Sequence, residues 1–135
     1  MNNLKEDKEL LLRDLCARLP YGVKVQTTYI MQSGERKDIG IDILTTVEIS
    51  MLIEGAEEHK PYLFPLSSMT EEQKYICPIG VGNLETFIEK ESWSYLELNF
   101  DSILRFIDWL NKNNFDYRGL IEKGLAIDAT GLNIY

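Results

Sequence analysis

The densest group of residues that could do acid–base or metal chemistry lies between positions 54 and 59. Glu54, Glu57, Glu58 and His59 stand together in a hydrophilic stretch that contains Gly55, and His59 is the only histidine of the chain. Carboxylates and imidazole serve both general acid–base catalysis and metal binding. Charged residues around a glycine more often form a solvated surface loop, and we prefer that interpretation. One histidine and two distant cysteines lack the ligand spacing of a zinc site, so we expect no metal.

A second pair of carboxylates, Asp38 and Asp42, flanks Gly40 with the spacing of one strand face. Carboxylates held close together raise one another's pKa and can then exchange protons with a substrate. The same spacing is also the ordinary pattern on the solvent face of a strand, which is the interpretation that we prefer. An enzyme that uses these carboxylates is therefore a minor alternative.

Nucleophilic catalysis has little support in the sequence. Ser67 and Ser68 are not part of a G-x-S-x-G motif. Cys77 precedes Pro78 and would need a neighbouring base and an electropositive setting to act as a nucleophile. The glycines at 80–82 have neither the number nor the spacing of a phosphate-binding loop. We expect no catalytic residue and no cofactor.

Four aromatic or basic residues are better candidates for contacts with another protein. They are Tyr62, Phe64, Tyr117 and Arg118. Tyrosine and arginine are over-represented where proteins anchor their partners. The competing interpretation is structural: the two upstream aromatic rings hold an irregular loop against a sheet, and Arg118 pairs with an acid such as Asp116 or Glu122.

The composition is that of an ordinary globular protein. Of 135 residues, 44% are hydrophobic and 27% are charged, so we expect one domain over residues 1–135. No apolar run approaches the ~20 residues of a membrane span, and the first residues lack the pattern of a secretory signal. These features, together with two cysteines that we expect to be reduced, predict a cytoplasmic protein without membrane contact.

The net charge of −8 argues against direct binding to nucleic acid, since each basic contact would form within the protein's own negative field. An acidic protein could instead imitate phosphate charge and inhibit a DNA-binding enzyme. That alternative needs an unbroken acidic face, whereas the acids here alternate with lysines in KEDKE and EKE.

The N-terminal half is predicted to form a helix and a small sheet. A helical stripe of apolar residues ends before Pro20, and its members are Leu4, Leu11, Leu12, Leu15, Cys16 and Leu19. Alternation over residues 23–31 predicts a strand. The same alternation returns from Ile39 to Ile53, which predicts one bent strand, or two strands joined near Thr45, with the isoleucines facing the core.

The C-terminal half is predicted to be mainly helical. Residues 53–73 read as an irregular stretch. Near its end a short helix should begin at Met69–Glu71, with a capping box of Ser68 and Glu71 or of Thr70 and Gln73, and it should end before Cys77. Residues 93–98 favour a strand. Asn99 or Asp101 should cap the next helix, and Asp116 should cap a short helix over 117–123 that Gly124 terminates. Residues 125–128 should then form a short strand or an extended tail.

Three blocks of the sequence carry a resemblance to a known family. They are ARLPYGVKVQ at 17–26, KPYLFPLSSMTEEQ at 60–73 and IDWLNKNNFDYRGLIEKGLAI at 107–127. In this order they resemble a family of short uncharacterised proteins encoded widely in gut bacterial genomes, often within prophage-like or other mobile segments. The closing DATGLNIY departs from the family, which tends to have an acid, alanine and proline there. The resemblance implies a bacterial, mobile-element setting and no particular chemistry.

Together these observations predict an α+β protein with an N-terminal helix, a small antiparallel β-meander and a helical C-terminal half. The function we expect first is that of a small non-catalytic intracellular binding or accessory protein, which acts on an unidentified protein partner through its surface. An apolar sheet edge could also support a homodimer. The acidic inhibitor and the carboxylate enzyme are the alternatives.

Overall fold

The computed structural model describes residues 4–90, 92–96 and 98–135, and its α+β architecture confirms the predicted fold class. The helices are α1 (Leu4–Arg18), α2 (Thr46–Glu54), α3 (Glu71–Ile76), α4 (Val81–Lys90) and α5 (Phe100–Lys112). The strands are β1 (Lys24–Ile30), β2 (Arg36–Ile43), β3 (Glu57–Pro65), β4 (Phe115–Asp116) and β5 (Ile127–Asp128). Single 3-10 turns cover Leu19–Tyr21, Leu66–Ser68 and Trp93–Tyr95. In the described part of the chain, no helix combines the length and apolar character that crossing a bilayer requires.

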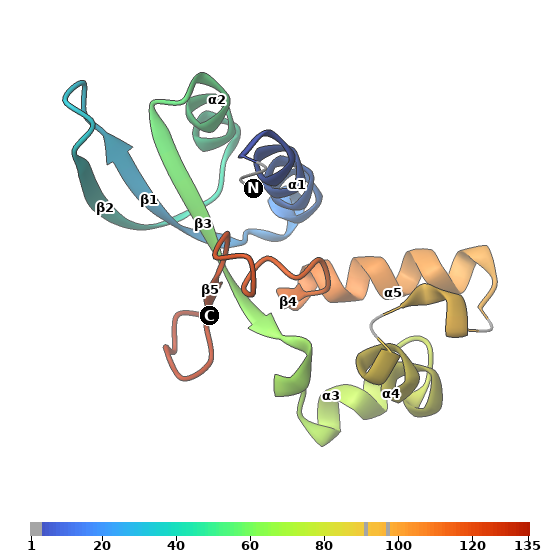
Figure 1. Cartoon of the computed structure of the whole chain (residues 1–135). Helices are drawn as coiled ribbons and strands as arrows, with labels where there is room; N and C mark the ends of the chain where they lie inside the picture. The colour runs from blue at the N-terminus through green and yellow to red at the C-terminus, as the bar shows by residue number, and fades with distance from the viewer. Residues whose placement is uncertain (1–3, 91, 97) are drawn as a thin grey trace.

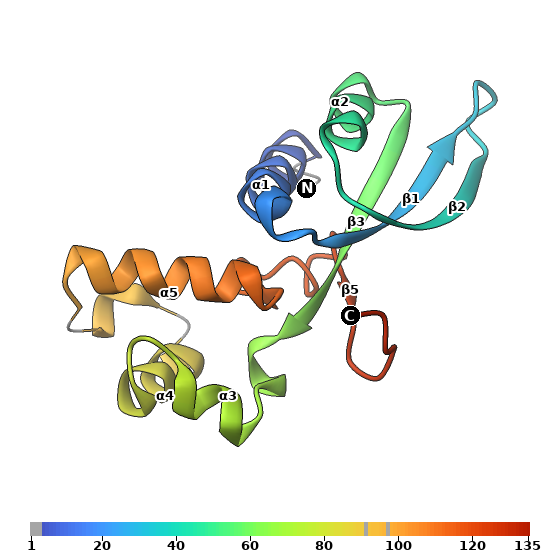
Figure 2. The ribbon, with the colours of Figure 1, turned by 180° about the vertical axis from the view of Figure 1, so that it is seen from behind.

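The sheet is mixed and has β3 at its centre (Figures 1 and 2). The strand order is β2-β1-β3-β4, and β5 also pairs with β3. The three long strands are antiparallel, as predicted, but β3 pairs with β1 and not with β2, so they do not form the predicted meander. β4 and β5 run parallel to β3. The C-terminal segment therefore returns to the sheet, and β3 connects the β1–β2 hairpin at one end with the helices α3 to α5 at the other.

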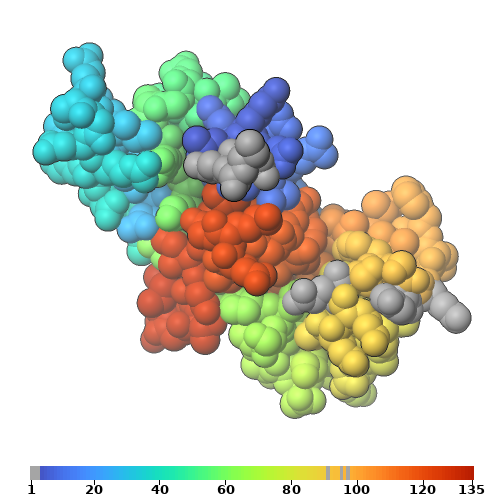
Figure 3. All heavy atoms as spheres, in the orientation of Figure 1, coloured from blue at the N-terminus to red at the C-terminus, as the bar shows by residue number. Residues whose placement is uncertain are grey.

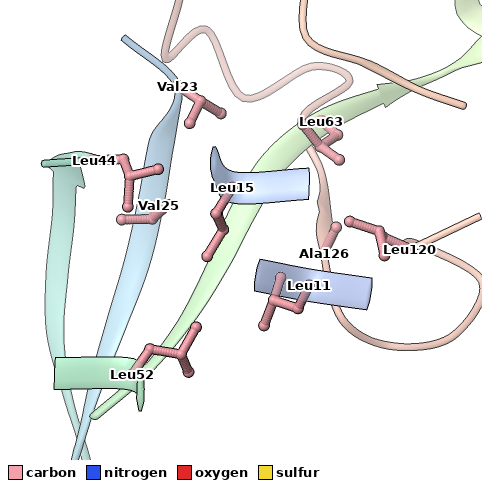
Figure 4. Close-up of a cluster of buried hydrophobic side chains, with 9 residues drawn as sticks. All are labelled: Leu11, Leu15, Val23, Val25, Leu44, Leu52, Leu63, Leu120 and Ala126. Carbon is pink, nitrogen blue, oxygen red and sulfur yellow. The ribbon is translucent and has the colours of Figure 1, made fainter. Parts of the chain in front are cut away.

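The first hydrophobic cluster lies where α1 and α2 cover one face of the sheet. Figure 4 shows the leucines of α1 directed toward Val23, Val25 and Leu63 of the sheet. The buried members of this cluster are Leu11, Leu15, Val23, Val25, Leu44, Leu52, Leu63, Leu120 and Ala126. Because Leu120 and Ala126 come from the C-terminal segment, that segment is part of the N-terminal core.

A second, more aromatic cluster holds α3, α4 and α5 together. Its buried members are Met69, Cys77, Ile79, Leu84, Phe87, Phe106, Leu110 and Phe115. The Phe106 ring packs edge-to-face against Phe87 and Trp93, with centroids 5.2 and 5.6 Å apart. The predicted strand over 93–98 is wrong at its start: residues 93–95 form a 3-10 turn, which Ser92 caps by accepting from the Ser94 amide. Residue 97 lies outside the described residues.

The alternating stretch from Ile39 to Ile53 was predicted to be strand throughout, which is confirmed up to Ile43 and wrong beyond it. β2 ends at Ile43, and α2 begins at Thr46 after a capping box in which Thr45 accepts from the Val47 amide and Glu48 accepts from the Thr45 amide. Ile39, Ile41 and Ile43 are 55%, 49% and 57% exposed. Thr45 followed three residues later by Glu48 is a helix-start signal, and it prevails over the β propensity of the flanking residues.

The stretch expected to be irregular instead contains β3, the central strand. Glu57 to Pro61 pair with β1, and Tyr62 to Pro65 pair with β4 and β5. Pro61 lies opposite Val25 in the β1 ladder. Proline normally argues against a central strand, so the two prolines misled the prediction.

Local signals placed most of the remaining elements. Thr70 and Gln73 form the capping box of α3, and Asn99 caps α5 by accepting from the Ser102 amide at 2.8 Å. The helix predicted over 117–123 is wrong, because Gly119 adopts a left-handed φ of 72° that interrupts helical geometry. In α1, Leu4 and Cys16 are exposed, contrary to prediction, because the buried face carries Asp14 and Arg18.

Candidate functional site

The most unusual feature of the interior is a buried ion pair in α1. Asp14 and Arg18 both have 0% exposure, and Arg18 Nε donates to Asp14 Oδ2 at 2.8 Å. Arg18 Nη2 also donates to the Phe115 carbonyl of β4 at 2.6 Å. Burying charges is costly unless they are paired and hydrogen-bonded. These contacts supply most of the pairing, although Arg18 Nη1 has no hydrogen-bond partner among the described residues.

Arg118 completes this buried ion cluster, which we define as Asp14, Arg18 and Arg118. Arg118 Nη1 donates to Asp14 Oδ1 at 2.8 Å, although the two residues are 104 positions apart. The structural interpretation of Arg118 named Asp116 or Glu122 as the partner, and that pairing is wrong. Asp116 instead accepts from the Leu120 and Ile121 amides at 3.0 and 2.9 Å, so it stabilises a turn where a helix cap was expected.

Tyr117 lies against both guanidinium groups of the cluster. Its ring centroid is 4.6 Å from the Arg118 Cζ and 5.4 Å from the Arg18 Cζ. The Tyr117 hydroxyl donates to Asn111 Oδ1 of α5 at 2.9 Å. The predicted pair Tyr117 and Arg118 is therefore partly exposed and held in place by contacts with two helices, α1 and α5.

These two residues line a groove of about 510 Å³, here called the aromatic groove. Leu66, Ser67, Phe87, Trp93, Ile121 and Glu122 line it as well. In Figure 3 the red-orange segment that contains Tyr117 and Arg118 borders the lime-green and yellow segments that supply the opposite wall. The groove thus joins apolar and aromatic surface to one fixed cationic group, Arg118, and to two carboxylates, Asp116 and Glu122.

The other two predicted interaction residues lie in β3 and are largely internal. Tyr62 is buried, burial raises the pKa of its phenol, and its carbonyl accepts from the Tyr135 hydroxyl at 2.7 Å. The Phe64 ring lies between Phe115 and Tyr135, with centroids 6.4 and 5.8 Å away. Neither residue lines the aromatic groove, so the four candidates do not form one site.

His59 lies in the sheet interior with 0% exposure, so the prediction of a solvated loop was wrong for this residue. Its Nδ1 is 3.0 Å from Thr27 Oγ1, and its Nε2 is 3.2 Å from Glu57 Oε1 without the alignment of a hydrogen bond. Burial lowers the pKa of His59, and the nearby carboxylates of Glu57 and Glu48 only partly oppose this effect. His59 also lies in the lining of a cavity of about 400 Å³ between α1 and the sheet, together with Glu57, Glu58 and Leu11.

Asp38 and Asp42 do not share a strand face. β2 contains a bulge at Ile39, so that Asp38 lies opposite Thr28 while Asp42 lies opposite Val25. Because Thr28 and Val25 point to opposite faces of β1, the two carboxylates are on opposite sides of the sheet. Asp38 accepts from the Thr28 hydroxyl at 2.8 Å.

The two cysteines differ in their exposure, and neither belongs to a group of metal-binding side chains in the described part of the chain. Cys16 is exposed, whereas burial raises the pKa of the Cys77 thiol, which disfavours the reactive thiolate. Within residues 4–90, 92–96 and 98–135, no three histidine, cysteine or acidic side chains are grouped so that they could hold a metal ion.

The ion cluster was missed in the sequence, although a signal for it was present. Asp14 and Arg18 occupy the same helical face as Leu11 and Leu15, and charges within a buried stripe indicate a paired polar site. Comparisons with family models, with curated proteins and with solved structures give no match for this chain. The family resemblance therefore stays a prediction.

Proposed function

We propose that this chain is a non-catalytic intracellular binding or accessory protein that holds a short segment of a partner protein in the aromatic groove. The observation that supports this most directly is the Tyr117–Arg118 pair, which is fixed by Asp14 and Asn111 yet remains partly exposed at the groove. Side chains that are held in place before binding lose little conformational entropy when a partner arrives.

The groove also indicates the chemistry of the segment. Phe87, Trp93 and Leu66 offer a surface for an aromatic or branched aliphatic side chain. A guanidinium has five N–H donors, and only Nη1 of Arg118 donates to Asp14, so donors remain for a carboxylate. The groove is lined by one cation, Arg118, and by two carboxylates, Asp116 and Glu122. Asp116 already accepts from the Leu120 and Ile121 amides, so Arg118 is the charged group best placed to bind an acidic residue. The proposed ligand is a segment with a large apolar residue next to Asp or Glu.

Glu122 gives a direct test of this charge preference. It lines the same groove and is exposed, so it opposes an acidic ligand only weakly, through water. We expect Glu122→Gln to strengthen binding of an acidic peptide by about threefold, the effect of one exposed charge contact. Isothermal titration at low salt measures this change, and unchanged or weaker binding would contradict an acidic ligand.

The experiment that tests the function is selection of peptides from a displayed random library. We expect enrichment of peptides that pair Asp or Glu with a large apolar residue. Ser67 is exposed and lines the groove, so Ser67→Arg should block the groove and abolish binding without disturbing the core. Ser50→Arg on α2 is the matched control and should bind as the wild type does. Enriched peptides that bind Ser67→Arg normally would overturn the proposal.

The two alternative functions have less support. Several surface acids are paired with bases, as in Arg36–Glu58, Lys74–Glu71 and Arg105–Asp101, whereas an inhibitor that imitates DNA needs an uninterrupted acidic face. For a carboxylate enzyme, the candidate acids Asp38 and Asp42 lie on opposite faces of the sheet. Neither alternative has a specific observation in its favour.

A further inference from the structure

The β2 strand is an open edge of the sheet. It pairs with β1 on one side, and in the described part of the chain no strand lies on its other side. Figures 1 and 2 show the β1–β2 hairpin projecting away from α3, α4 and α5. An open edge presents backbone N–H and C=O groups that can pair with a strand of another chain.

This edge is also apolar. Ile39, Ile41 and Ile43 are each about half exposed, and exposed Val47 follows at the start of α2. β2 also carries four charged residues, Arg36, Lys37, Asp38 and Asp42, and a bulge at Ile39. Charges and bulges on an edge strand disfavour unspecific pairing, so a strand that pairs here must match these charges.

The charges of β2 indicate which chain supplies such a strand. Lys37 lies opposite Tyr29 and Asp42 lies opposite Val25, and these two β1 residues point to the same face. The bulge at Ile39 therefore puts Lys37 and Asp42 on one face of β2, near opposite ends of the strand. A strand with a cation at one end and an anion at the other is complementary to an antiparallel copy of itself.

We propose that β2 pairs antiparallel with β2 of a second copy of this chain, so that the two sheets become one. About the two-fold axis, Lys37 of each copy lies opposite Asp42 of the other, and this ion pair forms twice. In the same register Arg36 and Asp38 lie opposite Ile43 and Ile41, on the shared opposite face. A parallel arrangement in register would instead place like charges beside one another.

The test is the mass in solution, measured by sedimentation equilibrium over a concentration series. We expect the wild type to reach twice the chain mass of 15.6 kDa. Lys37→Glu and Asp42→Lys should each weaken self-association by at least about tenfold, because each places like charges together twice. Both side chains are exposed, so both variants should fold. Lys5→Glu on α1 is the matched control and should dimerise normally.

Mixing the two variants distinguishes this interface from any other. In a heterodimer of Lys37→Glu with Asp42→Lys, both charge pairs are opposite again, so the mixture should dimerise although neither variant does alone. The double variant with both changes should also dimerise. The proposal is overturned if the wild type stays monomeric at its solubility limit or forms a larger assembly. It is also overturned if the single variants still dimerise or if their mixture stays monomeric.

Discussion

The edge strand β2 and the buried ion cluster depart from the usual distribution of side chains in opposite directions. β2 exposes Ile39, Ile41 and Ile43 to water, whereas the cluster removes Asp14 and Arg18 from water entirely. The charges of the cluster have partners within the chain, from α1, β4 and the C-terminal segment. The isoleucines have no such cover.

The difference separates a structural exception from an interaction surface. A buried charge that is paired within the chain stabilises one arrangement of the elements, because removing either partner leaves an uncompensated charge. An exposed apolar strand gains free energy only when something outside the chain covers it. We therefore expect mutations of the cluster to change folding and mutations of β2 to change association.

The largest effect is expected for Asp14→Ala. This change leaves two guanidinium groups without their shared carboxylate, and Arg18 stays fully buried, so the free energy of unfolding should fall by about 3–5 kcal/mol. Urea denaturation measures it. Asp108→Ala, at an exposed position of α5, is the control. Equal losses in the two variants would show that the cluster contributes nothing.

The two arginines of the cluster should differ. Arg18→Met removes a fully buried group with two acceptors and should cost about 2–3 kcal/mol, in the range of lost hydrogen bonds to charged groups. The Arg118 side chain is a quarter exposed, and the ion pair between Asp14 and Arg18 remains when Arg118 is removed. Arg118→Met should therefore lower the free energy of unfolding by about 1 kcal/mol or less. Urea denaturation of both variants gives the comparison, and a larger cost at Arg118 would contradict it.

His59 tests a third case, a buried polar group with incomplete pairing. Because burial lowers its pKa below the ordinary 6.5, the unfolded chain takes up a proton at a pH where the folded chain does not. This residue should therefore reduce stability as the pH falls below 6.5. The single histidine gives one imidazole resonance in an NMR titration, and its midpoint should lie below 6.5; a midpoint above that value would show that Glu57 dominates.

The smallest effect on folding is expected at the edge strand. Ile41→Thr keeps a β-branched residue at an exposed site, so the unfolding free energy of the monomer should change by no more than about 0.5 kcal/mol. Self-association of the same variant should weaken measurably. Denaturation under dilute, monomeric conditions and sedimentation at high concentration separate the two. A large loss of monomer stability would place Ile41 in the core.

Some elements of the fold could be predicted from the sequence and others could not. Thr70 with Gln73 and Asn99 with Ser102 fix helix starts over three positions, and both were predictable from local chemistry. The structure of the stretch from Ile39 to Ile53 was not predictable in the same way. Its alternating β-branched residues suit a strand, but the capping box of Thr45 and Glu48 starts a helix in its second half. The aromatic groove could be predicted only in part: Tyr117 and Arg118 were identified, but the opposite wall comes from residues 65–93.

By itself the sequence determined the starts of α3 and α5, the α+β class and two of the residues that line the groove, Tyr117 and Arg118. Those features depend on neighbours within a few positions along the chain. The tertiary structure decided the rest: that Arg118 binds Asp14 across 104 positions, that β3 runs through the centre, and that the isoleucines face water. Burial depends on which surfaces the other elements leave uncovered, and that is settled only when all of them pack.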